Sequence, residues 1–374
     1  MRQPAHPITE VIAYPLSQRL PEPTRTSWGT YDRVSILLVE VRTASGVVGW
    51  GEGLARFAPR AYSELVDTAL APRLAGREAS DIAAHWQAMR RALSGRAGGV
   101  LVEAMAAVDI ALWDILGKIA GQPLCRLLGG MGRAKVPVYA ASVGWADDAA
   151  AQTQLARFLD AGFTRAKLKI GAPAAAACRR IALMRRLAGP DVELTVDANW
   201  AYGLDEAEMV ARTLEEHGYA WFEEPLPPED EDGYERLAAR TAVPLAAGES
   251  NFTLAQAKRL VGNRTLAFLQ PNITRSGGIT EARRMADYAG AHDVKLAPHV
   301  GMSGIIAETA ALHLAAAMPN TAVLECAASA NRFKTELADL RPGAERAEGG
   351  HLAVPEGPGL GLTINRDALE ALAA

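Results

Sequence analysis

The hydrophobic pattern divides the chain into two parts. In the first part, residues 34–41 and 47–50 form apolar runs on either side of a short turn, which predicts two antiparallel strands. Residues 62–93 and 102–119 then repeat apolar positions at three- and four-residue steps, which predicts helices. A hairpin followed by helices predicts an α+β domain over residues 1–132.

Residues 19–31 break this pattern near the N-terminus. They follow a short apolar stretch at residues 8–14 and combine Pro21 and Pro23 with polar and aromatic side chains. Prolines at this density disfavour a regular strand, so a loop is predicted here.

From residue 133 onwards, short apolar runs alternate with longer helical stretches. Strands are predicted at residues 136–143, 166–170, 193–196, 219–222, 244–247, 266–269, 294–297 and 322–324. Helices are predicted between them at residues 148–161, 174–187, 205–217, 233–239, 254–261, 279–289 and 304–316. Strands that are apolar on both faces are typical of parallel barrels covered by helices. The pattern predicts an α/β fold, a modified TIM barrel of the (β/α)7β type, over residues 133–325.

The remaining segment, residues 326–374, does not continue the alternation. Its residues 355–361 are too rich in proline and glycine for another barrel unit. We expect this segment to return to the first domain and complete an α+β capping domain.

Polar residues end the predicted strands at steps of 23 to 28 residues, by subtraction of their numbers: Lys169, Asp197, Glu223, Glu249, Asn272, His299 and Glu325. The loops at the C-terminal ends of barrel strands build the active site, so we expect these side chains to converge. Asp197, Glu223 and Glu249 are an oxygen-only set that favours Mg²⁺. The alternative is that they form interior salt bridges with Lys167, Lys169 or neighbouring arginines.

Two lysines lie two positions apart on one predicted strand, so Lys167 and Lys169 point to the same face. Neighbouring ammonium groups lower each other's pKa, which suits a lysine to act as a base. A solvated lysine pair is the alternative, but the flanking apolar residues favour the barrel interior. His299 is the histidine that ends an apolar strand, which indicates an active-site role rather than a structural one.

Composition excludes several classes of partner. Lys plus Arg at 39 and Asp plus Glu at 43 give a net charge of −4, without a basic block for nucleic acid or anionic membranes. The three cysteines are far apart and outside metal-ligand spacings, which favours reduced thiols. No signal-peptide pattern or long apolar run is present, so a cytoplasmic protein is predicted.

With these motifs, the chain resembles the enolase superfamily, and within it the mandelate racemase subgroup. The resemblance spans nearly the whole chain and is carried by Asp109-Ile110-Ala111-Leu112-Trp113-Asp114, Leu127-Leu128-Gly129-Gly130, Lys167-Leu168-Lys169, Asp197-Ala198-Asn199, Glu223-Glu224-Pro225, Gly248-Glu249, Gln270-Pro271-Asn272, Gly277-Gly278, His299 and Glu325.

The resemblance implies Mg²⁺ bound by Asp197, Glu223 and Glu249, which holds the carboxylate of a small-molecule substrate, an acid sugar. It further implies that Lys169 removes the α-proton to give an enediolate and that Lys167 lowers the Lys169 pKa and helps to hold the carboxylate. Glu325 is implied to hydrogen-bond the carboxylate, and Asn199 to support the ligands and the substrate. Relatives are commonly assemblies, so a homo-oligomer is expected.

Asn272 departs from the family pattern, which has an aspartate that hydrogen-bonds the histidine. A neutral amide orients the ring but does not stabilise imidazolium, so chemistry led by one base, Lys169, is expected, with His299 as a neutral donor. Dehydration of an acid sugar is predicted; cycloisomerisation of a sugar-acid lactone and racemisation or epimerisation are alternatives. A Schiff-base aldolase and a barrel that binds a sugar acid without catalysis are alternatives of other classes.

Residues 19–31 and 51–60 are expected to close over the pocket. Within them, Arg25, Trp28, Tyr31 and Arg56 are candidates for contacting distal hydroxyl groups or a second carboxylate of the substrate. The alternative is that these side chains only cap the domain surface.

Overall fold

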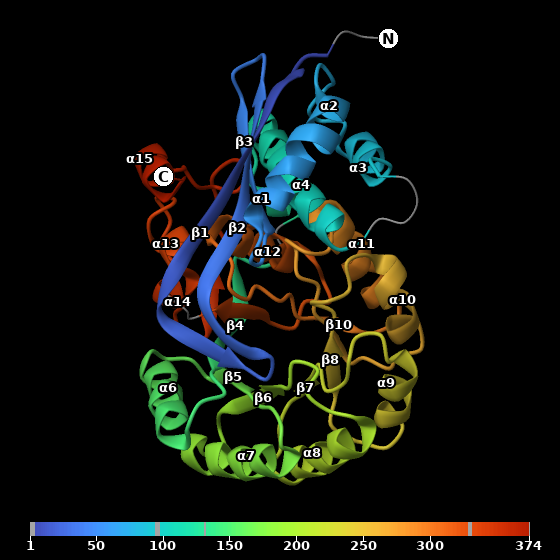
Figure 1. The fold of residues 1–374 in the computed structure, drawn as a ribbon, viewed down its shortest axis with the longest axis vertical. Coiled ribbons are helices and arrows are strands. Elements are labelled where there is room, and N and C mark those ends of the chain that lie inside the picture. The colour runs from blue at the N-terminus through green and yellow to red at the C-terminus, as the bar shows by residue number, and fades with distance from the viewer. Residues whose placement is uncertain (1–3, 94–97, 131, 328–330, 374) are drawn as a thin grey trace.

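The computed structural model describes residues 4–93, 98–130, 132–327 and 331–373 (Figure 1). It begins with a three-stranded antiparallel sheet in the order β1 (Ile8–Thr26), β2 (Gly29–Thr43) and β3 (Val48–Leu54). The apolar run in β2 is buried on both faces: Ile36 and Leu38 pack into one hydrophobic core, and Leu37 and Val39 into another. Successive strand residues point to opposite faces, so β2 is shared between two cores.

The expected loop at residues 19–31 is wrong, because β1 and β2 continue through most of it as a long hairpin. Arg19 pairs with Arg33, and Thr24 pairs with Tyr31 after a shift in register. Pro21 and Pro23 lie at that irregularity, on an edge strand of the sheet. A proline that lacks an N–H is tolerated at an edge or a bulge, so its presence does not exclude a strand. In Figure 1 the hairpin, in blue, runs down across the barrel.

The N-terminal helices are α1 (Pro59–Leu65), a π-helical turn η1 (Val66–Leu70), α2 (Ala71–Leu74), α3 (Ile82–Arg90), α4 (Val100–Ala120) and α5 (Leu124–Leu127). Helix α4 is buried over most of its length and packs closely on β3. A Cβ atom on Gly51 would lie 1.8 Å from the Ala107 carbonyl oxygen, so only glycine permits this approach.

The barrel is built from eight parallel strands, β4 (Lys135–Val143), β5 (Arg165–Lys169), β6 (Glu193–Asp197), β7 (Phe222–Glu223), β8 (Leu245–Ala247), β9 (Phe268–Leu269), β10 (Lys295–Leu296) and β11 (Leu324–Ala327). Seven helices connect them: α6 (Asp148–Asp160), α7 (Ala174–Ala188), α8 (Leu204–Glu216), α9 (Glu231–Ala238), α10 (Leu254–Gly262), α11 (Gly278–Ala291) and α12 (Ile305–Ala317). Strand β4 pairs with both β5 and β11, and a parallel bridge between Leu296 and Thr321 closes the ring. The (β/α)7β prediction is therefore confirmed.

The C-terminal segment returns to the N-terminal sheet. It contains α13 (Arg332–Thr335), α14 (Gly343–Arg346), β12 (His351–Ala353) and α15 (Arg366–Ala373). Arg366 donates two hydrogen bonds of 2.7 Å to the Glu40 carboxylate and lies over the Trp50 ring. These contacts agree with the expected path of the tail, and the domain boundaries at residues 132 and 325 stay predictions.

Two buried carboxylates of the N-terminal region cap barrel helices. Glu52 accepts hydrogen bonds from the backbone N–H groups of Gly304 (2.6 Å) and Ala307 (3.1 Å) at the start of α12. Asp109 accepts one from the Thr280 N–H (2.9 Å) at the start of α11. Helix N-termini favour negative charge, so these contacts join the two regions.

None of the helices in the described segments is both long and apolar enough to cross a membrane.

Candidate active site

The C-terminal ends of the barrel strands open into a cavity of about 500 Å³ beneath the β1–β2 hairpin. Five of the residues predicted from the strand ends and their neighbours line it: Lys169, Asn199, Glu249, His299 and Glu325. The structure therefore brings together residues that are more than 150 positions apart, by subtraction of 169 from 325. This convergence is the geometry that a barrel active site requires.

Protein ammonium groups hold two of the three candidate metal ligands. Lys167 Nζ lies 2.6 Å from Glu223 Oε1, and Lys169 Nζ lies 2.5 Å from Asp197 Oδ2. In the part of the chain that the structure describes, no group of three or more His, Cys, Asp or Glu side chains is arranged to hold a metal ion. These two pairs are therefore interior salt bridges, as in the alternative to a metal site that the sequence left open.

The surroundings of the carboxylates nevertheless fit a divalent cation. Three buried oxygen atoms beside them have no hydrogen-bond partner within the described residues: Asn199 Oδ1, Glu224 Oε2 and Gln270 Oε1. Burial raises the pKa of Glu223 to about 7, although Lys167 opposes it, and burial raises the pKa of Glu224 well above its usual range. A buried excess of oxygen acceptors is stabilised by a hard cation, and the all-oxygen set suits Mg²⁺.

Glu249 differs from the other two acids in its partners. Its Oε1 atom lies 3.6 Å from Arg275 and 3.8 Å from Arg56, and its Oε2 atom lies 2.5 Å from His299 Nε2. Burial raises the Glu249 pKa, but His299 and the guanidinium groups of Arg56 and Arg275 outweigh it and lower the pKa well below its usual range. Glu249 is therefore ionised, as a metal ligand must be.

The two lysines are more basic than the sequence suggested. Burial lowers the pKa of Lys169, and Lys167 lowers it further, but the Asp197 and Glu249 carboxylates outweigh both and the pKa is raised. Burial also lowers the pKa of Lys167, whereas Glu223 and Glu325 raise it well above its usual range. The sequence revealed the lysine pair but not the number of carboxylates around it.

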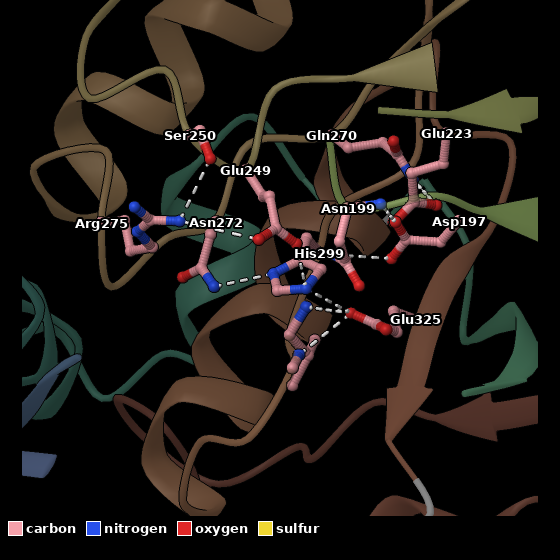
Figure 2. Close-up of polar contacts among 12 residues, drawn as sticks. Asp197, Asn199, Glu223, Glu249, Ser250, Gln270, Asn272, Arg275, His299 and Glu325 are labelled. Carbon is pink, nitrogen blue, oxygen red and sulfur yellow. Dashed lines mark hydrogen bonds and ion pairs between the residues drawn. The ribbon is translucent and has the colours of Figure 1, made fainter. Parts of the chain in front are cut away.

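Figure 2 shows how Asn272 orients His299. The Thr274 backbone N–H (2.9 Å) and hydroxyl (2.6 Å) both donate to Asn272 Oδ1. The amide NH₂ group therefore faces His299 Nδ1, 2.9 Å away, so Nδ1 is the acceptor and the ring proton lies on Nε2. Burial lowers the His299 pKa, but the Glu249 and Glu325 carboxylates together outweigh burial and raise it. A charged ring would, however, carry a proton on Nδ1, and that N–H would point at the NH₂ donor of Asn272. We therefore assign a neutral ring, because Thr274 fixes the amide.

Glu325 is an acceptor in this arrangement. Its Oε2 atom accepts hydrogen bonds from the backbone N–H groups of Val300 (2.6 Å) and Gly301 (2.9 Å), and its Oε1 atom lies 3.1 Å from Lys167. Burial raises the Glu325 pKa, but His299 and Lys167 with the Val300 N–H lower it to about 2. The ionised carboxylate can orient donors of a bound substrate and of the protein.

Comparison with known families agrees with this geometry. Residues 8–129 match the N-terminal domain of mandelate racemase and muconate lactonizing enzyme, and residues 150–368 match the enolase C-terminal domain-like family. The chain belongs to the mandelate racemase and muconate lactonizing enzyme family of the enolase superfamily. The resemblance inferred from the strand-end motifs is confirmed.

Named members of this family cover almost the whole chain. A D-galactarolactone cycloisomerase from Agrobacterium fabrum is 34% identical over 97% of both chains. A D-galactonate dehydratase from Ralstonia nicotianae is 36% identical over 88% of both chains. A racemase from Streptomyces coelicolor solved with bound magnesium has a TM-score of 0.89 at 30% identity, and the match covers 98% of this chain and 100% of that one. Lyases and isomerases are thus both represented, in agreement with the expected enzyme class.

The N-terminal region of this family member supplies one side of the cavity. Three of the four candidates for substrate contact, Trp28, Tyr31 and Arg56, line it, and Arg25 does not. Neighbouring Thr24 and Thr26 line it instead, because alternate residues of β1 point to opposite faces. No sequence motif pointed to Gln154, Arg157 and Phe158, which line the cavity from one face of α6.

The tip of the hairpin is fastened to the residue that supports Asp197. Trp28 Nε1 (2.8 Å) and Ser27 Oγ (2.9 Å) both donate to the Asn199 carbonyl oxygen. The Asn199 N–H in turn donates to Asp197 Oδ1 at 2.8 Å. Asn199 has a φ of 44°, a left-handed conformation that is uncommon outside glycine and that these contacts help to maintain.

We expect Trp28→Phe to loosen this hairpin tip. Loss of one hydrogen bond costs roughly 1 kcal/mol, so amide hydrogen exchange of residues 24–31 should become about fivefold faster. Trp113→Phe is the control, because its indole N–H binds Thr280 Oγ1 (2.9 Å) away from the hairpin. Unchanged exchange at the tip in Trp28→Phe would show that the contact does not hold it.

Proposed function

We propose that this protein is a Mg²⁺-dependent enzyme that removes the proton α to the carboxylate of an acid sugar, and that its overall reaction is a dehydration. The observation that carries the proposal is that one candidate base, Lys169, shares the cavity with a histidine, His299, that Asn272 holds in its neutral form. The D-galactonate dehydratase relative supports the substrate class. We keep the cytoplasmic location and the homo-oligomeric state as predictions.

Asp197, Glu223 and Glu249 would hold Mg²⁺, which would neutralise the substrate carboxylate and stabilise the charge of the enediolate. Lys169, deprotonated for the reaction, would accept the α-proton. The resulting ammonium would return that proton to the β-hydroxyl, which leaves as water on the same face. The enol product then tautomerises to a 2-keto-3-deoxy acid.

The other residues of the site bind and orient. Lys167 is fully buried and charged, so it would attract the substrate carboxylate without moving a proton. His299 would donate a hydrogen bond from Nε2–H to a substrate oxygen. A Schiff-base aldolase would not need the carboxylates of Asp197 and Glu223 that contact these two lysines, so that reaction is not favoured.

Cycloisomerisation of a sugar-acid lactone is the second candidate. The D-galactarolactone cycloisomerase relative matches 97% of both chains. In that reaction the leaving group is a carboxylate, which departs without a proton donor and therefore does not need an acidic His299. Racemisation is disfavoured, because it requires a second base on the opposite face.

An exchange experiment tests the function. Acid sugars and their lactones would be incubated in D₂O with the protein and Mg²⁺, and α-proton loss followed by NMR. We expect exchange or turnover with at least one hexonate or hexarate, abolished by a chelator. A dehydration product is lighter by one water, whereas a cycloisomerisation product keeps the substrate mass. A lack of α-proton exchange and turnover across the panel would contradict the proposal.

We expect Asn272→Asp to create a second base. The Thr274 donors would still bind one carboxylate oxygen, and the other would accept from Nδ1–H, which leaves His299 Nε2 free to take a proton. The measurement is deuterium incorporation with inversion at the α-carbon. Asn272→Ala is the control, since it adds no carboxylate. Inversion by the unmodified protein, or none by Asn272→Asp, would show that this amide does not decide the number of bases.

A further inference from the structure

Arg275 is a buried cation beside the candidate metal site that the sequence did not reveal. Its Nη1 atom lies 3.6 Å from Glu249 Oε1, which is longer than an N–H···O hydrogen bond (Figure 2). Its side chain is 10% exposed and its guanidinium lies over the Phe252 ring. A cation this close to a metal ligand either supports the ligand or competes with the metal for it.

Glu103 holds this guanidinium from the other side. Arg275 Nε donates to Glu103 Oε1 at 3.1 Å, and Arg275 Nη1 reaches Ser250 Oγ at 3.4 Å. The second oxygen of Glu103 accepts a 2.8 Å hydrogen bond from the Tyr62 hydroxyl. Glu103 and Tyr62 lie on α4 and α1, so the N-terminal region reaches the metal site through one arginine.

The geometry favours Glu103 over Glu249 as the partner of Arg275. A guanidinium released from Glu103 would be free to form a two-pronged ion pair with Glu249, since its planar fork matches a carboxylate. Both oxygens of Glu249 would then be engaged by Arg275 and His299. Because Glu103 holds the Arg275 guanidinium away from Glu249, the Glu249 carboxylate stays available for a metal.

We propose that Glu103 is a positioning residue that sets the Mg²⁺ affinity of the barrel by restraining Arg275. This inference rests on the Mg²⁺ site of the proposed function. It makes the N-terminal region part of the metal site, although the three carboxylate ligands all belong to barrel strands or the turns that follow them.

The test is calorimetric titration of the full chain with Mg²⁺ alone. Partners that orient metal ligands typically change affinity 10- to 100-fold, so Glu103→Gln should raise the Kd for Mg²⁺ by about tenfold. Glu52→Gln is the matched control, because Glu52 is also a buried carboxylate that joins the N-terminal region to the barrel but touches no candidate ligand. It should leave the Kd unchanged even if it lowers the Tm.

A double-mutant cycle separates positioning from general destabilisation. If Glu103 acts through Arg275, adding Glu103→Gln to Arg275→Met should not change the Kd further. Should Glu103→Gln fail to fold, Tyr62→Phe removes only a donor to Glu103 and should raise the Kd about threefold, the equivalent of a weakened hydrogen bond. In either case thermal unfolding is measured in parallel.

The outcomes are distinct. An unmodified protein that does not bind Mg²⁺ would overturn the proposed function, and this inference with it. An unmodified protein that binds Mg²⁺, with the same Kd in Glu103→Gln, would overturn the inference alone. An additive effect in the Arg275→Met background would also overturn it, because Glu103 would then act by another route.

Discussion

Replacing Lys169 with methionine is expected to reduce turnover of an acid sugar by about 10⁴-fold, the upper range of a general acid–base contribution. Methionine keeps the length of the side chain but removes the group that accepts the α-proton. It also removes the ammonium that lies 2.5 Å from Asp197, so Mg²⁺ should bind at least as tightly as before. The measurements are kcat, α-proton exchange in D₂O and the Kd for Mg²⁺.

Lys295→Met is the control for this substitution. Lys295 is an exposed lysine on barrel strand β10, with its ammonium over the Phe268 ring and outside the cavity lining. Its loss should leave α-proton exchange unchanged. Exchange that persists in Lys169→Met would assign the base to another residue and would contradict the one-base mechanism.

Glu223→Gln is expected to abolish Mg²⁺-dependent turnover and to raise the Kd for Mg²⁺ by more than the tenfold expected for Glu103→Gln. The substitution removes a charged ligand, and it also removes the 2.6 Å partner of the buried Lys167 ammonium. An uncompensated buried charge destabilises the fold, so the Tm should fall as well. Calorimetric titration and thermal unfolding measure the two effects separately.

A control and an independent test accompany this prediction. Glu193→Gln changes the exposed carboxylate at the opposite end of β6, which contacts Arg165 on the surface, and should alter neither quantity. A chelator added to the unmodified protein should stop turnover reversibly. Full activity of Glu223→Gln, or activity without divalent cations, would exclude the proposed metal site.

The strand-end residues could be predicted because a barrel brings the C-terminal ends of successive strands to one mouth. Lys169, Glu249 and His299 needed only the period of the chain and that rule. The hairpin was missed, since Pro21 and Pro23 disfavour a strand locally while an edge position and a register shift accommodate them. The local sequence pattern does not show whether a segment lies at the edge of a sheet, and this position decides between a loop and a strand here.

Contacts between distant segments were also beyond the sequence. Glu103 and Arg275 are 172 positions apart, and nothing in either neighbourhood identifies the other as its partner. Asn272 was recognised as a departure from the family pattern, but the direction of its amide depends on the donors of Thr274. The orientation of the Asn272 amide is therefore set by contacts in the folded structure, which the sequence motif does not specify.

Strand β2 places its residues alternately in two hydrophobic cores, one of which includes Ile305 and Ile306 of α12. The N-terminal sheet therefore shares a hydrophobic core with strand β4 and helix α12 of the barrel, in addition to covering the barrel mouth. Recombination between relatives at the predicted boundary near residue 132 would mismatch the first of these cores, because it joins Ile36 and Leu38 to Ile305 and Ile306, whereas the residues of the second core all lie before that boundary. Substrate preference of this protein would therefore be altered with less disturbance by substitutions at the hairpin tip, at Trp28 and Tyr31, than by replacing the whole N-terminal region.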